Sequence, residues 1–411
     1  MKNRIAWKRI TAILLTCCLL CSLLPLGAAA KATVGNLRFS AEGEFKILAI
    51  TDMHQGSQYQ PNMVRFIAAA LDAHQPDLVV FDGDNLDGER SDPFASEAQM
   101  ETSMRYFLTP LLERNVPFVV VQGNHDASYG RNSGFDSDAQ YAMYRRIGGN
   151  LNLTRDPVPS LNGTGNCNVT IAASAGSKTA MNLYFLDCIE DNPLPEQMEW
   201  MAGISRSLKA HNGGATVPSM LFQHIVPAEV IEAQTPLPFS LGSLSRSFND
   251  KSYGFLGDLW NFDGYPFEPV GGRSAEGEVE AIQAQGDIFA VVYGHNHLNY
   301  YQTVINNTRY INIPSCSELG SYGNFLFRGA TLFTFHEGNP ADFTMENVPY
   351  WKLINIQPLT LKEYWDYSPD FCQQKLLEPF SFLYYIVEMG AQAVLFPFKW
   401  VFRENKPVWV G

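Results

Sequence analysis

Clusters of Asp, Asn and His recur along this sequence, and each cluster directly follows a short apolar run. Carboxylate, amide and imidazole groups in combination are ligands for Fe, Zn or Mn. A pair of such ions can neutralise a phosphate ester, activate water and stabilise a leaving oxygen. The clusters contain the residue types that a pair of metal ions with one bridging carboxylate needs. The candidate ligands are Asp52, His54, Asp84, Asn124, His224, His295 and His297.

The apolar runs before these clusters are typical of buried strands. Residues 45–50, 78–81, 118–121 and 288–293 are apolar runs that end at candidate ligands, which predicts an α/β fold. Further strands are predicted at residues 184–186 and 220–222, the second just before His224. Because the carboxyl ends of neighbouring parallel strands share one edge of a sheet, we expect the clusters to meet in one crevice.

Amphipathic segments between the strands predict helices that cover the sheet. Two apolar stripes have helical spacing and are expected to face the core: Met63, Phe66, Ile67, Ala70 and Leu71, then Met100, Met104, Phe107, Leu108 and Leu111. Residues 128–177 are rich in Gly, Asn, Ser and Asp, which predicts excursions above the sheet rather than core. Residues 234–273 are interpreted as a substrate-side loop or lid.

The order of the clusters resembles the calcineurin-like metallophosphoesterase signature over about residues 45 to 335. The matching motifs are Asp52 with His54, Gly83-Asp84-Asn85, Gly123-Asn124-His125-Asp126, His224 and Gly294-His295-Asn296-His297. Within that superfamily the chain is most similar to the small phosphoesterases related to purple acid phosphatases. The resemblance implies a four-layer αββα sandwich of two mixed sheets flanked by helices.

The resemblance also implies a role for each candidate residue. Asp52, His54 and His297 would hold one metal ion, Asn124, His224 and His295 the second, and Asp84 would bridge the two. A metal-bridged hydroxide would attack phosphorus. His125 would protonate the leaving oxygen, and Asp126 would orient its imidazole.

One departure from the purple acid phosphatase pattern limits what can be carried over. Those enzymes place a metal-binding Tyr shortly after the Gly-Asp cluster, whereas here Asn85, Leu86 and Asp87 follow Asp84. No tyrosinate-to-iron chromophore is therefore predicted, and the identity of the metal pair stays open among Fe, Zn and Mn. Asp87 is interpreted as shaping the turn or supporting the ligands from behind.

The first residues of the chain predict export, and the last residues bear on membrane association. Residues 1–30 combine basic residues, an apolar run and Ala28 to Ala30, as in a cleaved signal peptide, with an uncleaved anchor as the alternative. Residues 40–345 are assigned to the catalytic domain and residues 346–411 to a C-terminal extension. Its apolar segment, about residues 379–402, either spans a membrane, lies on one or docks on the protein, and Glu388 disfavours spanning. The predicted location is extracytoplasmic, either secreted or membrane-anchored.

Composition narrows the partners. The chain has 411 residues, 46% of them apolar, and a formal charge of −13, which disfavours nucleic acid as a partner but permits a small phosphorylated substrate bound through metal ions. Outside the signal region, Cys167, Cys188, Cys316 and Cys372 are either disulfide-bonded or buried thiols.

Two functions of different kinds follow from the sequence. The first is an exported phosphoesterase that hydrolyses phosphate mono- or diesters at a binuclear metal centre. The alternative is a catalytically silent binding or scaffold protein of the same fold, tethered by its C-terminal tail. Substrate identity is expected to depend on the loops within residues 128–177 and 234–273, so the sequence leaves it open, together with the oligomeric state.

Overall fold

The computed structural model describes residues 37–354 except residues 58, 88–93, 95, 128–134, 189–192, 194, 239–244, 255–261, 267, 273–276 and 319–325. The predicted signal peptide and the apolar segment near residues 379–402 therefore lie outside the described residues. Among the helices that are described, none is long and apolar enough to cross a membrane.

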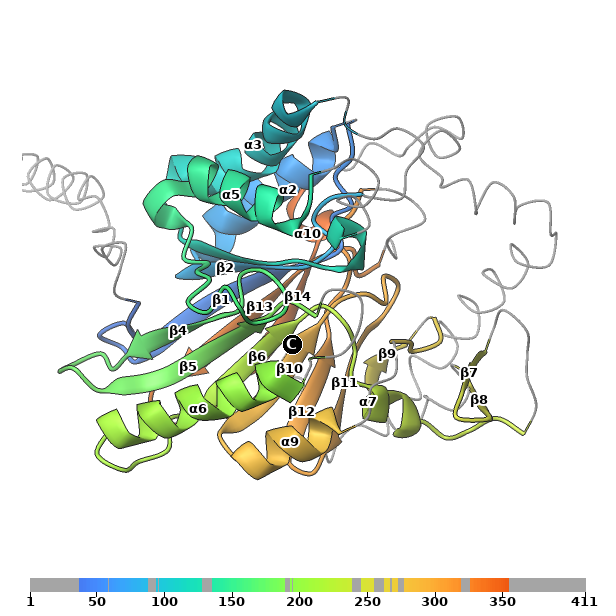
Figure 1. The fold of residues 1–411 in the computed structure, drawn as a ribbon. Coiled ribbons are helices and arrows are strands. Elements are labelled where there is room, and N and C mark those ends of the chain that lie inside the picture. The colour runs from blue at the N-terminus through green and yellow to red at the C-terminus, as the bar shows by residue number, and fades with distance from the viewer. Residues whose placement is uncertain are drawn as a thin grey trace, which may run out of the picture.

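Two mixed sheets form the centre of the fold (Figure 1). The first has the order β14-β13-β1-β2-β3, in which β1, β2 and β3 are parallel and β13 runs antiparallel to β1. Its strands are β1 (Glu44–Ile50), β2 (Leu78–Asp82), β3 (Phe118–Val121), β13 (Gly329–His336) and β14 (Thr344–Pro349).

The second sheet has the order β4-β5-β6-β10-β12-β11-β9, with parallel pairing from β5 through β6 and β10 to β12. Its strands are β4 (Cys167–Ala172), β5 (Thr179–Leu186), β6 (Ser219–Gln223), β9 (Asp263–Tyr265), β10 (Ile288–Tyr293), β11 (Tyr300–Ile305) and β12 (Thr308–Asn312). A separate hairpin pairs β7 (Arg246–Phe248) with β8 (Lys251–Tyr253).

Helices cover the outer faces of both sheets, as Figure 1 shows. On the first sheet lie α2 (Pro61–His74), α3 (Glu97–Arg114), α5 (Ser137–Gly148) and the short α10 (Tyr350–Leu353). On the second lie α6 (Pro195–His211), α7 (Ala228–Glu232) and α9 (Glu278–Gln285). Capping side chains start two of them: Ser96 accepts the Gln99 N–H before α3, and Asp136 accepts the Ala139 N–H before α5.

Alternation along each strand produces three apolar layers. In β1, Leu48 and Ile50 face the helices, whereas Ile47 and Ala49 face the second sheet, where Phe222 joins the same cluster. All the apolar residues predicted for the two helical stripes are buried in α2 and α3. Burying each large side chain contributes about 1.5–3 kcal/mol, so these layers hold the two sheets face to face. The predicted αββα sandwich of two mixed sheets is confirmed.

One sequence prediction needs correction. Residues 128–177 are not only excursions, because α5 places Met143, Tyr144 and Ile147 in the core and β4 forms an edge strand. The sheet also continues past residue 345, since β14 ends at Pro349 and Tyr350 stacks on Phe66 with ring centroids 4.4 Å apart. The predicted loop at residues 234–273 contains β7, β8 and the edge strand β9.

The cysteines within the described part of the chain are thiols. Cys167, Cys188 and Cys316 are free and buried, and burial raises the pKa of Cys167 and of Cys316 to about 12. These values make both thiols poor nucleophiles near neutral pH. Cys372 lies outside the described residues.

Candidate metal centre

The seven candidate ligands come from the ends of five strands in both sheets. The loop after β1 carries Asp52 and His54, the loop after β2 carries Asp84, and Asn124 follows β3, all in the first sheet. In the second sheet, His224 follows β6, and His295 and His297 follow β10. The structure brings these side chains together at the seam between the sheets.

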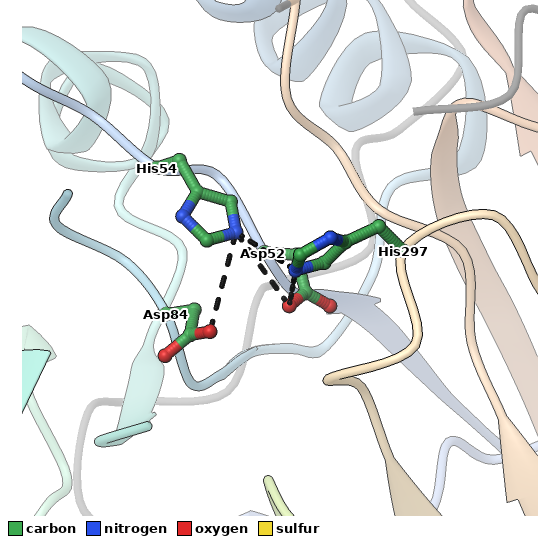
Figure 2. Close-up of side chains that lie close together, drawn as sticks. All are labelled: Asp52, His54, Asp84 and His297. Carbon is green, nitrogen blue, oxygen red and sulfur yellow. Dashed lines mark hydrogen bonds and ion pairs between the residues drawn. The ribbon is translucent and has the colours of Figure 1, made fainter. Parts of the chain in front are cut away.

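One group of potential ligands consists of Asp52, His54, Asp84 and His297, whose ligand atoms lie within 4.8 Å of one another (Figure 2). Nε2 of His54 is 3.2 Å from Nε2 of His297, and the two nitrogens are 3.8 and 3.4 Å from Oδ1 of Asp52. Two imidazole nitrogens and a carboxylate oxygen thus face one point.

A second group contains Asp84 again, with His224 and His295. Nε2 of His224 is 3.0 Å from Oδ2 of Asp84, and Nδ1 of His295 is 2.9 Å from Oδ1 of Asn124. The Asn124 amide therefore lies beside the second group, and Asp84 is the member that both groups share.

The hydrogen bonds behind His224 show that these groups fit a cation. Its Nδ1 is 2.8 Å from the backbone carbonyl of Asp82, which can only accept, so Nδ1 carries a proton. Nε2 then points at the carboxylates of Asp84 and Asp52. Three buried atoms here make no hydrogen bond of good geometry: Asp52 Oδ1, Asp84 Oδ2 and His224 Nε2. A cation among them would satisfy all three, which is the arrangement expected of metal ligands.

The buried carboxylates and imidazoles of the site shift one another's pKa values, in opposite directions for different histidines. Burial opposes ionisation of Asp84, but His224, His125 and His54 hold its pKa well below the usual range. Burial likewise opposes protonation of His224, yet Asp84 and Asp52 raise its pKa to about 10. Burial and neighbouring histidines lower the pKa of His54 and of His295, which favours the neutral imidazole that binds metal.

The backbone of the ligand loops is strained where it turns away from the strands. Asp52, His54, Asp84 and His295 have φ angles of 50°, 47°, 49° and 66°, in the left-handed region that L-residues avoid. Such residues cost on the order of 1–3 kcal/mol each. Packing of the surrounding sheet must offset this strain. In this backbone conformation the ligand side chains converge on one point.

Gly123 is required because Asp84 and His224 approach it closely. A Cβ at Gly123 would lie 2.3 Å from Oδ1 of Asp84, 2.5 Å from its backbone nitrogen and 2.6 Å from Cδ2 of His224. Gly294 is in the same situation against Thr51 and Asp52. The glycines in the sequence motifs therefore make room for the ligands beside them.

Replacing Gly123 by Ala is expected to weaken metal binding and to destabilise the fold by about 1–3 kcal/mol, because the added methyl group must displace the Asp84 carboxylate. Thermal unfolding and metal content measure the two effects. Gly203→Ala in α6 is the matched control, since its Cβ would meet only Arg206 Nη2 at 3.8 Å. That change is expected to stabilise the protein slightly. Equal behaviour of the two variants would contradict the packing argument.

His125 lies at the edge of both groups, and with His54 and Asp87 it forms a third group of potential ligands. Its Nε2 is 3.9 Å from Oδ2 of Asp84, and its ring meets the His54 ring edge-on with centroids 4.6 Å apart. Its backbone N–H donates to Oδ1 of Asp84 at 2.7 Å. The imidazole is thus beside the shared carboxylate, with about a tenth of the side chain exposed.

Asp126 does not have the role that the resemblance implied. Its carboxylate accepts hydrogen bonds from the backbone N–H groups of Asn85, Leu86 and Gly123, and from the Asn85 side chain. It therefore braces the loops after β2 and β3 instead of orienting His125. Asp87 is the carboxylate nearest to His125 Nδ1, with its Oδ1 at 3.9 Å, and is the better candidate for that task. Burial and the charge of Asp84 raise the pKa of Asp126 to about 7.

The sequence did not indicate the residues that hydrogen-bond the loop carrying His295 and His297. The Asn296 side chain donates to the Gly271 carbonyl and accepts the Gly271 N–H, at 3.1 and 3.0 Å. Glu268 accepts the Leu298 N–H at 2.8 Å. Burial lowers the pKa of His297, but Asp52 and, to a smaller extent, the charge of Glu268 raise it. Asn296 is part of the Gly294-His295-Asn296-His297 motif, but no motif or spacing in the sequence indicated Glu268 or Gly271.

A cavity of about 780 Å³ adjoins the His125 segment through Ala127. Its lining is rich in carboxylates: Asp136, Asp138, Asp156, Asp187 and Glu196. None of the candidate metal ligands lines it. The cavity therefore lies beside the candidate centre, where the loops expected to govern specificity begin.

Sequence comparison connects this geometry to known proteins. The family model described as calcineurin-like phosphoesterase matches residues 45–299. Probable inactive purple acid phosphatase 29 of Arabidopsis thaliana is 28% identical over 297 residues, which cover 64% of this chain and 69% of that protein. Phosphatase DCR2 of Saccharomyces cerevisiae is 32% identical over 106 residues, covering 22% of this chain and 18% of that protein.

Solved structures show only distant likeness. A dimetal phosphatase from Danio rerio aligns with a TM-score of 0.44 and 10% identity, over 74% of this chain and 96% of that one. GAP50, described as the anchor in the inner membrane complex of Plasmodium, aligns with a TM-score of 0.39 and 12% identity, over 76% of this chain and 87% of that one.

Proposed function

This chain belongs to the calcineurin-like phosphoesterase family, and from that premise we propose that it is an exported enzyme that hydrolyses small phosphate mono- or diesters with two metal ions. The proposed ions are Fe, Zn or Mn, in like or mixed pairs, because the site combines imidazole, carboxylate and amide ligands.

The observation that carries the proposal is the double use of Asp84. One set of ligand atoms joins Asp84 to Asp52, His54 and His297, and another joins it to His224 and His295. A carboxylate that belongs to two converging sets is what a pair of neighbouring ions requires. A single structural ion would need only one of the sets.

The residues of the chain have separable tasks in this proposal. When bound, the two ions would supply positive charge to the phosphoryl oxygens and lower the pKa of water. Asp52 and Asp84 fix the positions of the ligand groups. His125, beside Asp84, is placed to give a proton to the leaving oxygen, and Asp87 is placed to hold the imidazole.

A catalytically silent protein is the second candidate, because relatives of this chain carry the name probable inactive purple acid phosphatase. Against it stand the convergent ligand groups and His125 beside Asp84. Loss of ligands, which commonly removes activity, is not found at the candidate positions.

The test is hydrolysis of p-nitrophenyl phosphate and bis-p-nitrophenyl phosphate by the whole chain loaded with Fe, Zn or Mn. We expect turnover of at least one ester, loss of that turnover after chelation, and recovery when the same metal is returned. Elemental analysis should show about two ions per chain, as a two-metal centre requires. Full occupancy without turnover of either ester, or failure to bind metal, would favour the silent protein and contradict the proposed enzyme.

Export is part of the proposal and is supported by the basic and apolar residues of the first 30 positions. Cell fractionation and N-terminal sequencing test it, and intact protein retained in the cytoplasm would contradict it.

Membrane association through residues 379–411 is tested by deleting that segment and assaying both vesicle binding and hydrolysis. Loss of vesicle binding alone would assign the tail to anchoring.

A further inference from the structure

The hairpin of β7 and β8 places the side chain of Arg246 against Gly271, whose backbone is hydrogen-bonded to Asn296 in the loop after β10. Arg246 is the first residue of β7, and its guanidinium lies directly on Gly271. A Cβ at Gly271 would be 1.4 Å from Nη1 and 1.8 Å from Cζ of Arg246. The glycine therefore provides the space that the guanidinium occupies.

Gly271 connects this guanidinium to the candidate metal centre. Its backbone N–H and carbonyl are both hydrogen-bonded by the side chain of Asn296, which stands between His295 and His297. The positive charge of Arg246 contributes to the pKa of two groups there. Burial lowers the pKa of His295, and the charge of Arg246 lowers it further. Burial raises the pKa of Glu268, and the charge of Arg246 opposes that rise. Through Gly271 the guanidinium is thus one contact away from Asn296, the residue between His295 and His297.

The guanidinium has donors to spare. Within the part of the chain that the structure describes, Arg246 makes no hydrogen bond and no salt bridge, and the residue is solvent-exposed. A guanidinium carries five N–H donors and stays charged at all ordinary pH values. Burial lowers the pKa of Arg246, and Glu268 is the acidic neighbour that opposes this shift, but the two described side chains form no salt bridge with each other, so the N–H donors of the guanidinium stay available to an anion.

We propose that Arg246 binds a phosphate oxygen of the substrate and makes the site selective for phosphate monoesters over diesters. A guanidinium matches the geometry of two phosphate oxygens and pairs with them more strongly than a neutral donor does. A monoester is a dianion near neutral pH, whereas a diester carries one charge and one oxygen fewer for such a contact. The inference rests on the proposed phosphoesterase activity and narrows its substrate class.

The test compares four variants of the whole metal-loaded chain: Arg246→Ala, Arg246→Lys, Gly271→Ala and Lys251→Ala. Gly271→Ala keeps the positive charge but displaces the guanidinium. Lys251 belongs to the same hairpin and supplies the matched control for loss of one charge. Two quantities are measured: the ratio of kcat/KM for p-nitrophenyl phosphate to that for bis-p-nitrophenyl phosphate, and the affinity for inorganic phosphate by calorimetry.

Arg246→Ala and Gly271→Ala are expected to lower that ratio about 10- to 100-fold and to weaken phosphate binding about 10-fold or more, as loss of a charge-assisted hydrogen bond predicts. Arg246→Lys should lie between them and the wild type, and Lys251→Ala should match the wild type. An unchanged ratio with unchanged phosphate affinity in Arg246→Ala overturns the inference, as does an equal loss in Lys251→Ala.

The proposed function can fail separately. If the wild type hydrolyses neither ester, the phosphate affinities alone decide: weaker binding by Arg246→Ala than by Lys251→Ala supports the anion contact, and equal binding overturns it. If the wild type binds no phosphate at all, the inference is also overturned.

Discussion

Replacing Asp84 by Asn or Ala is expected to reduce ester hydrolysis at least about 1,000-fold and to lower the metal content. The carboxylate belongs to both ligand groups, so the variant loses the oxygen that each ion needs. Charge stabilisation by a metal pair amounts to several kcal/mol, and each 1.4 kcal/mol is a factor of ten in rate. Steady-state kinetics and elemental analysis on the same preparation give both numbers.

Asp84→Asn is the more informative of the two changes. It keeps the side-chain volume and an oxygen that can accept the His125 N–H, so the fold should persist by circular dichroism. Asp72→Asn is the control, since Asp72 is an exposed acid paired with Arg114 on the helical layer. Asp84→Asn with most of the wild-type turnover and both ions would show that the bridging assignment is wrong.

His125→Ala is expected to lower turnover about 100- to 10,000-fold while leaving the metal content unchanged, which is the usual contribution of a general acid. The loss should depend on the leaving group. An alkyl or phenyl phosphate needs protonation of its leaving oxygen, whereas p-nitrophenolate departs with less help. The measurement is kcat for a series of monoesters plotted against the pKa of the leaving alcohol, for the variant and the wild type.

His211→Ala is the matched control for this change, because His211 is exposed at the end of α6 and bonds to the Ser207 carbonyl. It should leave both kinetics and metal content unchanged. Loss of metal from His125→Ala would show that His125 is a ligand. A loss of equal size for every leaving group would exclude proton donation.

The strands and the candidate ligands could be predicted because local pattern and chemistry agree there. The apolar runs at residues 118–121 and 288–293 coincide with β3 and β10, and the loops after the strands carry the polar residues. Apolar runs bounded by turn residues give a strong strand signal. Strand pairing then brings the ligands together, which the parallel arrangement implied but the sequence could not measure.

Helix α5, the role of Asp126 and the position of Arg246 depend on tertiary contacts, which a local sequence pattern does not predict. Ser137 to Gly148 lies among Gly- and Asn-rich neighbours, so composition predicts an excursion there, although Met143, Tyr144 and Ile147 have helical spacing and are buried in α5. Asp126 follows His125 directly in sequence, which suggested a partnership, but the helical turn directs its carboxylate to the backbone of the loop after β2. The contact of Arg246 with Gly271 joins segments whose order in space only the tertiary fold decides.

The seam between the sheets has a consequence for how the protein acquires its ions. Asp52, His54, Asp84 and Asn124 are carried by one sheet, and His224, His295 and His297 by the other. Neither half of the sandwich alone holds a complete ligand set for either ion. A chain in which only one sheet has formed would therefore offer an incomplete set of ligands for each ion.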